Sequence, residues 1–167
     1  MFGYGRDMSL KNTLYDQDFY AWANTQAELL RAGKLAEADI ENIAEEIESM
    51  GRSERSELVN RLDILLAHLL KWQFQPERRG RSWELTVKEQ RFRISRHLER
   101  NPSLKSSLGE ALVDAYEAAL FSAQRETDLD ESVFPGACPW SIEEILDRNL
   151  MPMNADFAGD LPDKCAN

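Results

Sequence analysis

The sequence predicts an all-α protein, a compact helical bundle of about five helices with one long helix at about residues 40–74. Apolar residues recur at helical spacing along most of the chain, and no segment alternates strictly between apolar and polar residues as a half-buried strand does. At 167 residues with 43% hydrophobic content, the chain fits one domain with its own core. We therefore expect a single helical domain over residues 1–150 and a flexible C-terminal tail over residues 151–167, where prolines interrupt any period.

The first expected helix is delimited by a cap and a glycine. Asp16 can cap its N-terminus, and Gly33 is a good stop signal. Between them, residues such as Phe19, Trp22 and Leu29 lie mostly three or four positions apart. Asp39 is then placed to cap the next helix.

The long second helix is predicted by an apolar stripe that keeps its phase, as in a core helix. At 100° per residue, all members fall within about 60° of one direction. They are Ile40, Ile43, Ile47, Met50, Leu58, Leu62, Leu65, Leu69 and Trp72. The polar stretch GRSERSE interrupts the stripe, but a loop would have no reason to preserve helical phase across it. We therefore favour one helix of on the order of 50 Å, and the alternative is two helices broken at Gly51.

The third and fourth helices follow two prolines. Pro76 ends the long helix, and apolar periodicity predicts a third helix over about residues 83–100. Asn101 and Pro102 then form a start signal, because proline fits the first helical position. We expect this fourth helix to end near Thr127.

The last expected helix is short and begins with a capping box. Ser141 and Glu144 have the spacing at which each side chain bonds the other residue's backbone N–H. This pattern predicts a helix over residues 142–149.

The charge of the chain bears on its partners and its location. A net charge of −10 repels nucleic acid and anionic membranes, so a general affinity for either is not expected, and the alternative is a local basic patch that overrides this repulsion. The N-terminus lacks the apolar segment of a signal peptide, and the run ILLAHLLKW is too short to span a bilayer. Cys138 and Cys165 lack metal-ligand spacing and are expected to be free thiols, although a disulfide between them stays open. These features predict a cytoplasmic protein.

An acidic ridge is the first candidate site. Glu41, Glu45 and Glu48 lie at about 120°, 160° and 100° from Ile47, away from the apolar stripe. We favour a solvated or ion-paired helix face. The alternative is a divalent-metal site for Mg²⁺ or Mn²⁺, since an E-x-x-E pair binds metal in the all-helical nucleotide pyrophosphohydrolases, although the E-x-x-D that completes such sites is missing here. Outside that alternative the sequence identifies no cofactor, and the cofactor is unknown.

A basic segment over residues 76–100 is the second candidate site. Arg78, Arg79 and Arg81 adjoin the start of the third helix, whose free N–H groups favour phosphate, and Arg91 lies further along it. They are the candidate anion-binding residues. Alternatively, the basic residues pair with the acidic ridge and fix the register of the two helices.

The third candidate site comprises His68 and Lys71, three residues apart on the shoulder of the apolar stripe. We favour a half-buried histidine that hydrogen-bonds a backbone or carboxylate group. The alternative is catalytic, with His68 as a general base beside Lys71. No serine or cysteine nucleophile lies at a spacing that the sequence can connect to it.

Four stretches carry a resemblance to a known family. They are, in order, LYDQDFYAWANTQAELLRAG, DIENIAEEIESMGRSERSEL, LLAHLLKWQFQPERRGRSW and FPGACPWSIEEILD. Together they closely resemble the bacterial family catalogued as domain of unknown function number 29, over about residues 14–151. The resemblance implies a compact all-helical bacterial protein and implies no activity. It makes residues 39–48 and 68–83 the first places to look for a site.

Three classes of function remain from the sequence. The leading hypothesis is a cytoplasmic interaction or regulatory module that acts through a protein partner or through self-association. The second is a divalent-metal-dependent hydrolase of a phosphorylated small molecule or nucleotide, with the glutamates on the metal and the arginines on the phosphate. The third is an anion or nucleic-acid binder that uses the arginines of residues 76–100.

Overall fold

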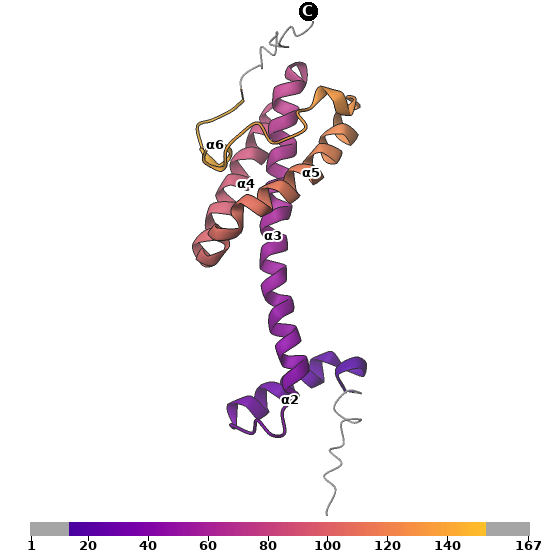
Figure 1. The fold of residues 1–167 in the computed structure, drawn as a ribbon, viewed down its shortest axis with the longest axis vertical. Helices are drawn as coiled ribbons and strands as arrows, with labels where there is room; N and C mark the ends of the chain where they lie inside the picture. The colour runs from indigo at the N-terminus through magenta and orange to yellow at the C-terminus, as the bar shows by residue number, and fades with distance from the viewer. Residues whose placement is uncertain (1–13, 153–167) are drawn as a thin grey trace, which may run out of the picture. The chain divides into compact units, whose positions relative to one another are not determined.

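The structure is a computed structural model that describes residues 14–152, and within them it contains helices and no strands (Figure 1). The predicted all-α class is confirmed. The chain divides into two compact units, Met1–Ser53 and Glu54–Asn167, called here the N-terminal unit and the C-terminal unit. The prediction that residues 1–150 act as one domain stays a prediction. Cys165 and the predicted tail from residue 153 onward lie outside the described residues.

Helix α2 (Phe19–Arg31) belongs to the N-terminal unit, and its cap differs from the predicted one. The Asp18 side chain accepts a hydrogen bond from the Ala21 N–H at 2.9 Å. Asp16 lies inside a separate helical turn at residues 14–17, so its prediction as the cap was wrong. After α2, Gly33 adopts a φ of 71°, the left-handed conformation in which glycine has no steric penalty, as expected of the predicted stop.

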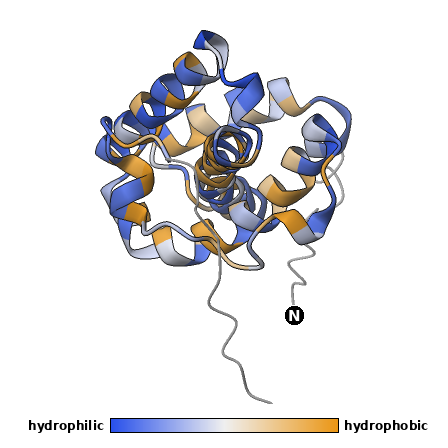
Figure 2. Cartoon of the chain, turned by 90° about the horizontal axis from the view of Figure 1, so that it is seen from above, coloured by the Kyte–Doolittle hydropathy of each residue, from blue (hydrophilic) through white to orange (hydrophobic). Residues whose placement is uncertain are grey.

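Helix α3 (Ile40–Phe74) is a single helix of 35 residues and contributes to both units. It runs without a break through Gly51, which confirms the predicted long helix and excludes two helices broken at that glycine (Figure 1). Seen end-on in Figure 2, α3 carries both hydrophobic and hydrophilic positions.

The predicted apolar stripe of α3 is buried along only part of its length. In the C-terminal unit, the stripe leucines are fully buried at 0% exposure: Leu58, Leu62, Leu65 and Leu69. In the N-terminal unit, Ile40 is 49% exposed, Ile47 63% and Met50 68%. The prediction of one continuous core stripe was therefore wrong for these three residues.

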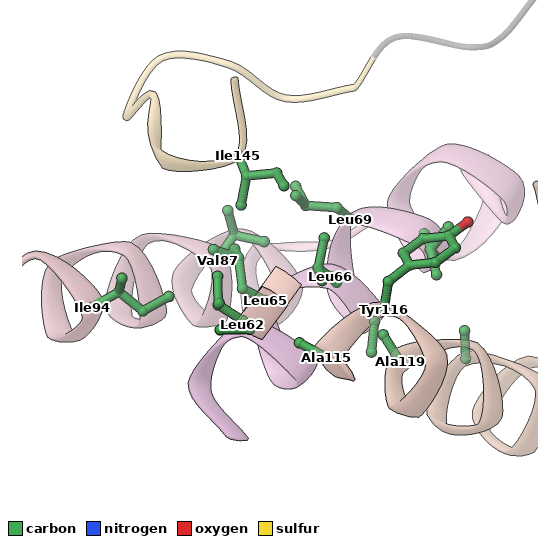
Figure 3. Close-up of a cluster of buried hydrophobic side chains, with 14 of the residues drawn as sticks. Leu62, Leu65, Leu66, Leu69, Val87, Ile94, Ala115, Tyr116, Ala119 and Ile145 are labelled. Atoms are coloured by element: carbon green, nitrogen blue, oxygen red, sulfur yellow. The ribbon is translucent and has the colours of Figure 1, made fainter. Parts of the chain in front are cut away.

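The C-terminal unit has a core to which four helices contribute. Helices α4 (Arg81–Arg100) and α5 (Leu108–Thr127) pack against the second half of α3. Figure 3 shows α3 leucines such as Leu66 close to Tyr116 of α5, with Ile145 of α6 pointing toward Leu69. On α5, four small residues are fully buried: Ala111, Ala115, Ala119 and Ala123. Small side chains permit a close approach of two helices, so this stripe explains how α5 packs into the core.

The predicted ends of the later helices are partly correct. Helix α4 begins at Arg81, two residues before the predicted start, and ends at Arg100 as predicted. The Asn101–Pro102 signal opens a 3₁₀ helix, η2 (Pro102–Ser107), and α5 begins only at Leu108.

The Asn101 side chain makes no capping hydrogen bond to this segment, and its Nδ2 donates to Glu54 Oε2 at 3.0 Å. The capping box of α6 (Ile142–Leu146) is formed as predicted, with Ser141 and Glu144 each bonded to the other's backbone N–H, although α6 ends before residue 149. None of the helices in the described part of the chain is long and apolar enough to cross a membrane.

Candidate functional site

Asp39 is at the centre of a hydrogen-bond network in the N-terminal unit. Its Oδ2 accepts from Trp22 Nε1 at 3.3 Å and from Asn42 Nδ2 at 2.7 Å, and its backbone N–H donates to Gln26 Oε1 at 2.8 Å. Trp22 and Gln26 are both buried. Asp39 therefore ties α2 to the start of α3 and acts as a structural residue.

Glu46 anchors an aromatic cluster on the same side of α3. The Tyr15 hydroxyl donates a hydrogen bond to Glu46 Oε1, and this bond raises the pKa of Tyr15 to about 12. The Tyr15 ring lies edge-on to Trp22 with 4.8 Å between centroids, and Phe19 lies 5.3 Å from Trp22. Two of the five carboxylates in residues 39–48 are thus engaged in holding α2 and the preceding turn against α3.

The three glutamates of the acidic ridge are exposed. Glu41, Glu45 and Glu48 all lie on the surface, and Glu48 forms an ion pair with Arg52 one turn later at 3.7 Å. Among residues 14–152, no group of three or more His, Cys, Asp or Glu side chains is arranged to hold a metal ion. The metal-site hypothesis thus receives no supporting geometry from this region.

An exposed apolar surface lies between the aromatic cluster and the acidic ridge. Ile40, Ile47 and Met50 form its large side chains, and Ala44 and Gly51 lie within about 60° of Ile47 on the same side of the helix. We call these five residues the α3 apolar face. The sequence placed its large members on one stripe, but it did not reveal that they are exposed.

The Lys71 ammonium is the centre of a polar cluster in the C-terminal unit. Lys71 is 3% exposed, forms an ion pair with Glu126 of α5, and lies 4.9 Å from the centroid of the Trp83 ring of α4. A carboxylate and an aromatic face both favour a buried cation. The cluster therefore joins α3, α4 and α5 at one point.

The geometry around His68 identifies its tautomer. His68 Nδ1 lies 2.8 Å from the Ile64 carbonyl oxygen, which only accepts, so Nδ1 carries the proton. Nε2 is then an acceptor 3.4 Å from Lys71 Nζ. Burial, and secondarily the charge of Lys71, lower the pKa of His68 below its usual value of 6.5. His68 and Lys71 are thus brought together, but the basic nitrogen of His68 already faces an ammonium group.

Asp63 is a further polar residue of this part of α3. Burial raises the pKa of its carboxyl group above 3.8, against the lowering effects of a hydrogen bond from Ser122 and of the charge of Arg125. One carboxyl oxygen, Oδ1, is buried and has no hydrogen-bond partner among the described residues.

The sequence singled out neither Asp63 as part of a site nor Glu126 as the partner of Lys71. Glu126 is 55 positions from Lys71, and no spacing rule connects residues on different helices. For the cluster around Lys71, the sequence offered one signal, which was the position of Trp83 in a stretch that carries the family resemblance.

The four candidate anion-binding arginines have different environments. Arg78 and Arg81 are exposed near the start of α4. Arg79 Nε donates to the Trp72 carbonyl oxygen at 2.6 Å, and its guanidinium lies 5.4 Å from the Trp72 ring centroid. Arg91 is 3% exposed, and its Nε donates to the Ile145 carbonyl oxygen at 2.7 Å, so it holds α6 against α4. Arg79 and Arg91 thus have structural contacts.

Two further arginines of α4 pair within their own helix. Arg93 forms an ion pair with Glu89 at 2.7 Å, and Arg96 forms one with Glu99 at 3.0 Å. Such exposed pairs contribute about 0–1 kcal/mol each.

Comparison with known proteins identifies the family. The model for the family described as Domain of unknown function DUF29 matches residues 14–151. Because the match spans most of the chain, the protein belongs to this family, and its function is not assigned by that description. No curated protein and no solved structure matches the chain.

Proposed function

We propose that this member of the DUF29 family is a cytoplasmic interaction or regulatory module that acts through protein contacts made by its N-terminal unit. The observation that carries the proposal is the exposure of the α3 apolar face, in which Ile47 and Met50 are 63% and 68% exposed. Large apolar side chains gathered on one side of a helix are typical of a surface that another protein covers.

The residues around the α3 apolar face support this function. Its centre contains isoleucine, methionine, alanine and glycine, and on one side it adjoins the exposed carboxylates of Glu41 and Glu48. On the other side lies the aromatic cluster, where Phe19 is 50% exposed. An apolar centre with aromatic residues and a polar rim is the usual composition of a protein–protein interface.

The C-terminal unit supports the proposal in a different way. Its core is filled by its own helices, and among the described residues the nine large apolar side chains below 2% exposure all lie within residues 58–145. A stable unit with its own core can carry a binding segment without needing that segment for its own packing.

The two other hypotheses, a metal-dependent hydrolase and an anion or nucleic-acid binder, still rest on the sequence alone. A divalent-metal-dependent hydrolase would use Glu41, Glu45 and Glu48, and an anion or nucleic-acid binder would use the arginines of residues 76–100. The contacts found in the described residues favour neither of them over protein contacts, since Arg79 and Arg91 hold backbone carbonyls.

A photo-crosslinking experiment tests the proposed function. A photoreactive phenylalanine analogue is placed at position 47, on the α3 apolar face, and in a matched control at position 45, on the acidic ridge. We expect irradiation in cells to give one discrete protein adduct from position 47 and none from position 45, with the crosslinked peptide identified by mass spectrometry. Equal, diffuse labelling from both positions would contradict a specific contact.

A further inference from the structure

We infer that the α3 apolar face is covered by the same face of a second copy of this chain, so that the protein is a homodimer joined through the first part of α3. This inference rests on the proposed function, because it names the partner of the same surface.

The spacing of the apolar residues is that of a helix-pairing seam. Ile40, Ile47 and Met50 of the face, together with the half-buried Ile43 beside them, are separated by three, four and three residues in the order Ile40, Ile43, Ile47, Met50. This alternation is the heptad pattern of helices that pair along their length, and β-branched residues such as isoleucine are favoured at alternate positions of a two-helix seam. A seam of this kind is self-complementary, because isoleucine and methionine from one copy pack against the same residue types of the other.

The small residues permit a second helix to approach closely. Ala44 and Gly51 lie seven residues apart on the same side as Ile47. A Cβ atom placed on Gly51 would meet nothing within 4 Å, so the space over this part of α3 is open. An open strip with small side chains fits another helix better than it fits a loop with bulky side chains.

The N-terminal unit buries little apolar surface by itself. Within residues 14–53, Trp22 and Ala38 are the buried apolar residues, whereas Phe19, Tyr20, Leu30, Leu35, Ile40, Ile47 and Met50 are all at least 40% exposed. A segment of this size rarely keeps a defined fold without further packing. A second copy is a partner that is present at equal concentration whenever the chain is made.

The charges of the chain shape how such a dimer responds to salt. Its centre is apolar, and the acidic ridge adds negative charge beside it on each copy. Association of two acidic copies through apolar residues should persist or tighten with added salt, because salt screens the repulsion of the copies and strengthens apolar contacts. A basic protein partner held by the acidic ridge would show the opposite response.

Sedimentation velocity of the full chain across the micromolar range, at low and high salt, tests the inference. We expect a monomer–dimer equilibrium. Ile47→Glu should raise its dissociation constant about 100-fold or more, because each copy loses a buried isoleucine and gains a buried carboxylate. The matched control, Glu48→Gln, should change the constant less than about threefold. Circular dichroism verifies that each variant is folded, and Met50→Gln replaces Ile47→Glu if the latter unfolds.

A chain that stays monomeric throughout, or a dimer that Ile47→Glu and Met50→Gln leave intact, overturns the inference. Binding of the neutral dye Nile red then separates this failure from that of the proposed function. If the monomer binds the dye and Ile47→Glu abolishes the binding, the face is open to a different protein and the proposed function stands. If the monomer does not bind the dye, the face is covered within the chain and both proposals fail.

Discussion

The two parts of α3 have the same apolar periodicity and opposite environments. In the C-terminal unit, Leu62 and Leu65 are fully buried by α4 and α5, whereas in the N-terminal unit Ile47 and Met50 are mostly exposed. The helix itself does not change, since it is continuous through Gly51. Periodicity thus identifies which side of a helix is apolar. It does not by itself distinguish whether another helix of the same chain or a partner protein covers that side.

The largest expected effect contrasts one residue from each part of α3. Leu65→Ala should lower the free energy of unfolding by about 2–5 kcal/mol, because it leaves a cavity in a filled core. Ile47→Ala should lower it by about 0.5 kcal/mol or less when the protein is dilute enough to be monomeric. Urea unfolding of both variants measures the difference. Losses of similar size would show that Ile47 is buried within its own chain.

The buried lysine of the C-terminal unit gives the second effect. Glu126→Gln removes the carboxylate from the buried Lys71 ammonium and should destabilise the protein by about 1–2 kcal/mol, below the full value for a buried pair because Glu126 is half-exposed. The matched control is Glu117→Gln, at an exposed position of the same helix. Adding Lys71→Met to Glu126→Gln should restore part of the loss. Equal thermal midpoints for the Glu126 and Glu117 variants would contradict this role.

The third effect concerns the continuity of α3. Gly51→Ala should raise the free energy of unfolding by up to about 1 kcal/mol, since alanine is the better helix former and the space around the position is open. Chemical denaturation of the dilute protein measures the gain. A loss of stability would instead indicate that the chain needs glycine there, as a break in the helix would require.

The smallest expected effect is a pH dependence of stability, and it comes from His68 in the C-terminal unit. The folded state lowers the pKa of His68, so the unfolded chain takes up a proton first as the pH falls below 6.5. Stability should therefore decrease on acidification from pH 7 toward about 5.5, by less than about 1 kcal/mol, and His68→Gln should flatten this decrease. Thermal midpoints of the protein and of the His68→Gln variant, measured across this pH range, test the expectation. An unchanged slope in the variant would assign the decrease to other groups.

Much of the fold follows from local signals in the sequence. The capping box at Ser141 is a pattern whose partners lie three residues apart, and it forms as predicted. The choice between Asp16 and Asp18 as the cap of α2 does not follow from the local pattern. Both side chains can cap a helix, and they lie only two residues apart. The bond from Tyr15 to Glu46 places the preceding turn on α3, and such a contact between distant residues leaves no trace in the local pattern.

The candidate sites were less predictable than the helices. The spacing of His68 and Lys71 on one helix brings them to 3.4 Å, and the bond from His68 Nδ1 to the Ile64 carbonyl oxygen agrees with the interpretation of a half-buried histidine bonded to the backbone. Glu126 was missed because it comes from another helix, and its position depends on how α5 packs. Arg91 was grouped with exposed arginines, since charge alone does not distinguish a surface guanidinium from one buried against a backbone carbonyl.

The hydrogen bond from Trp22 to Asp39 has a spectroscopic consequence. Of the four tryptophans of the chain, Trp22 is the one in the N-terminal unit, and its indole is buried beside the start of α3. A chain in which Trp72, Trp83 and Trp140 are replaced by phenylalanine would emit tryptophan fluorescence from this unit alone. The loss of order in the N-terminal unit could then be followed optically, separately from the unfolding of the core formed by α3, α4 and α5.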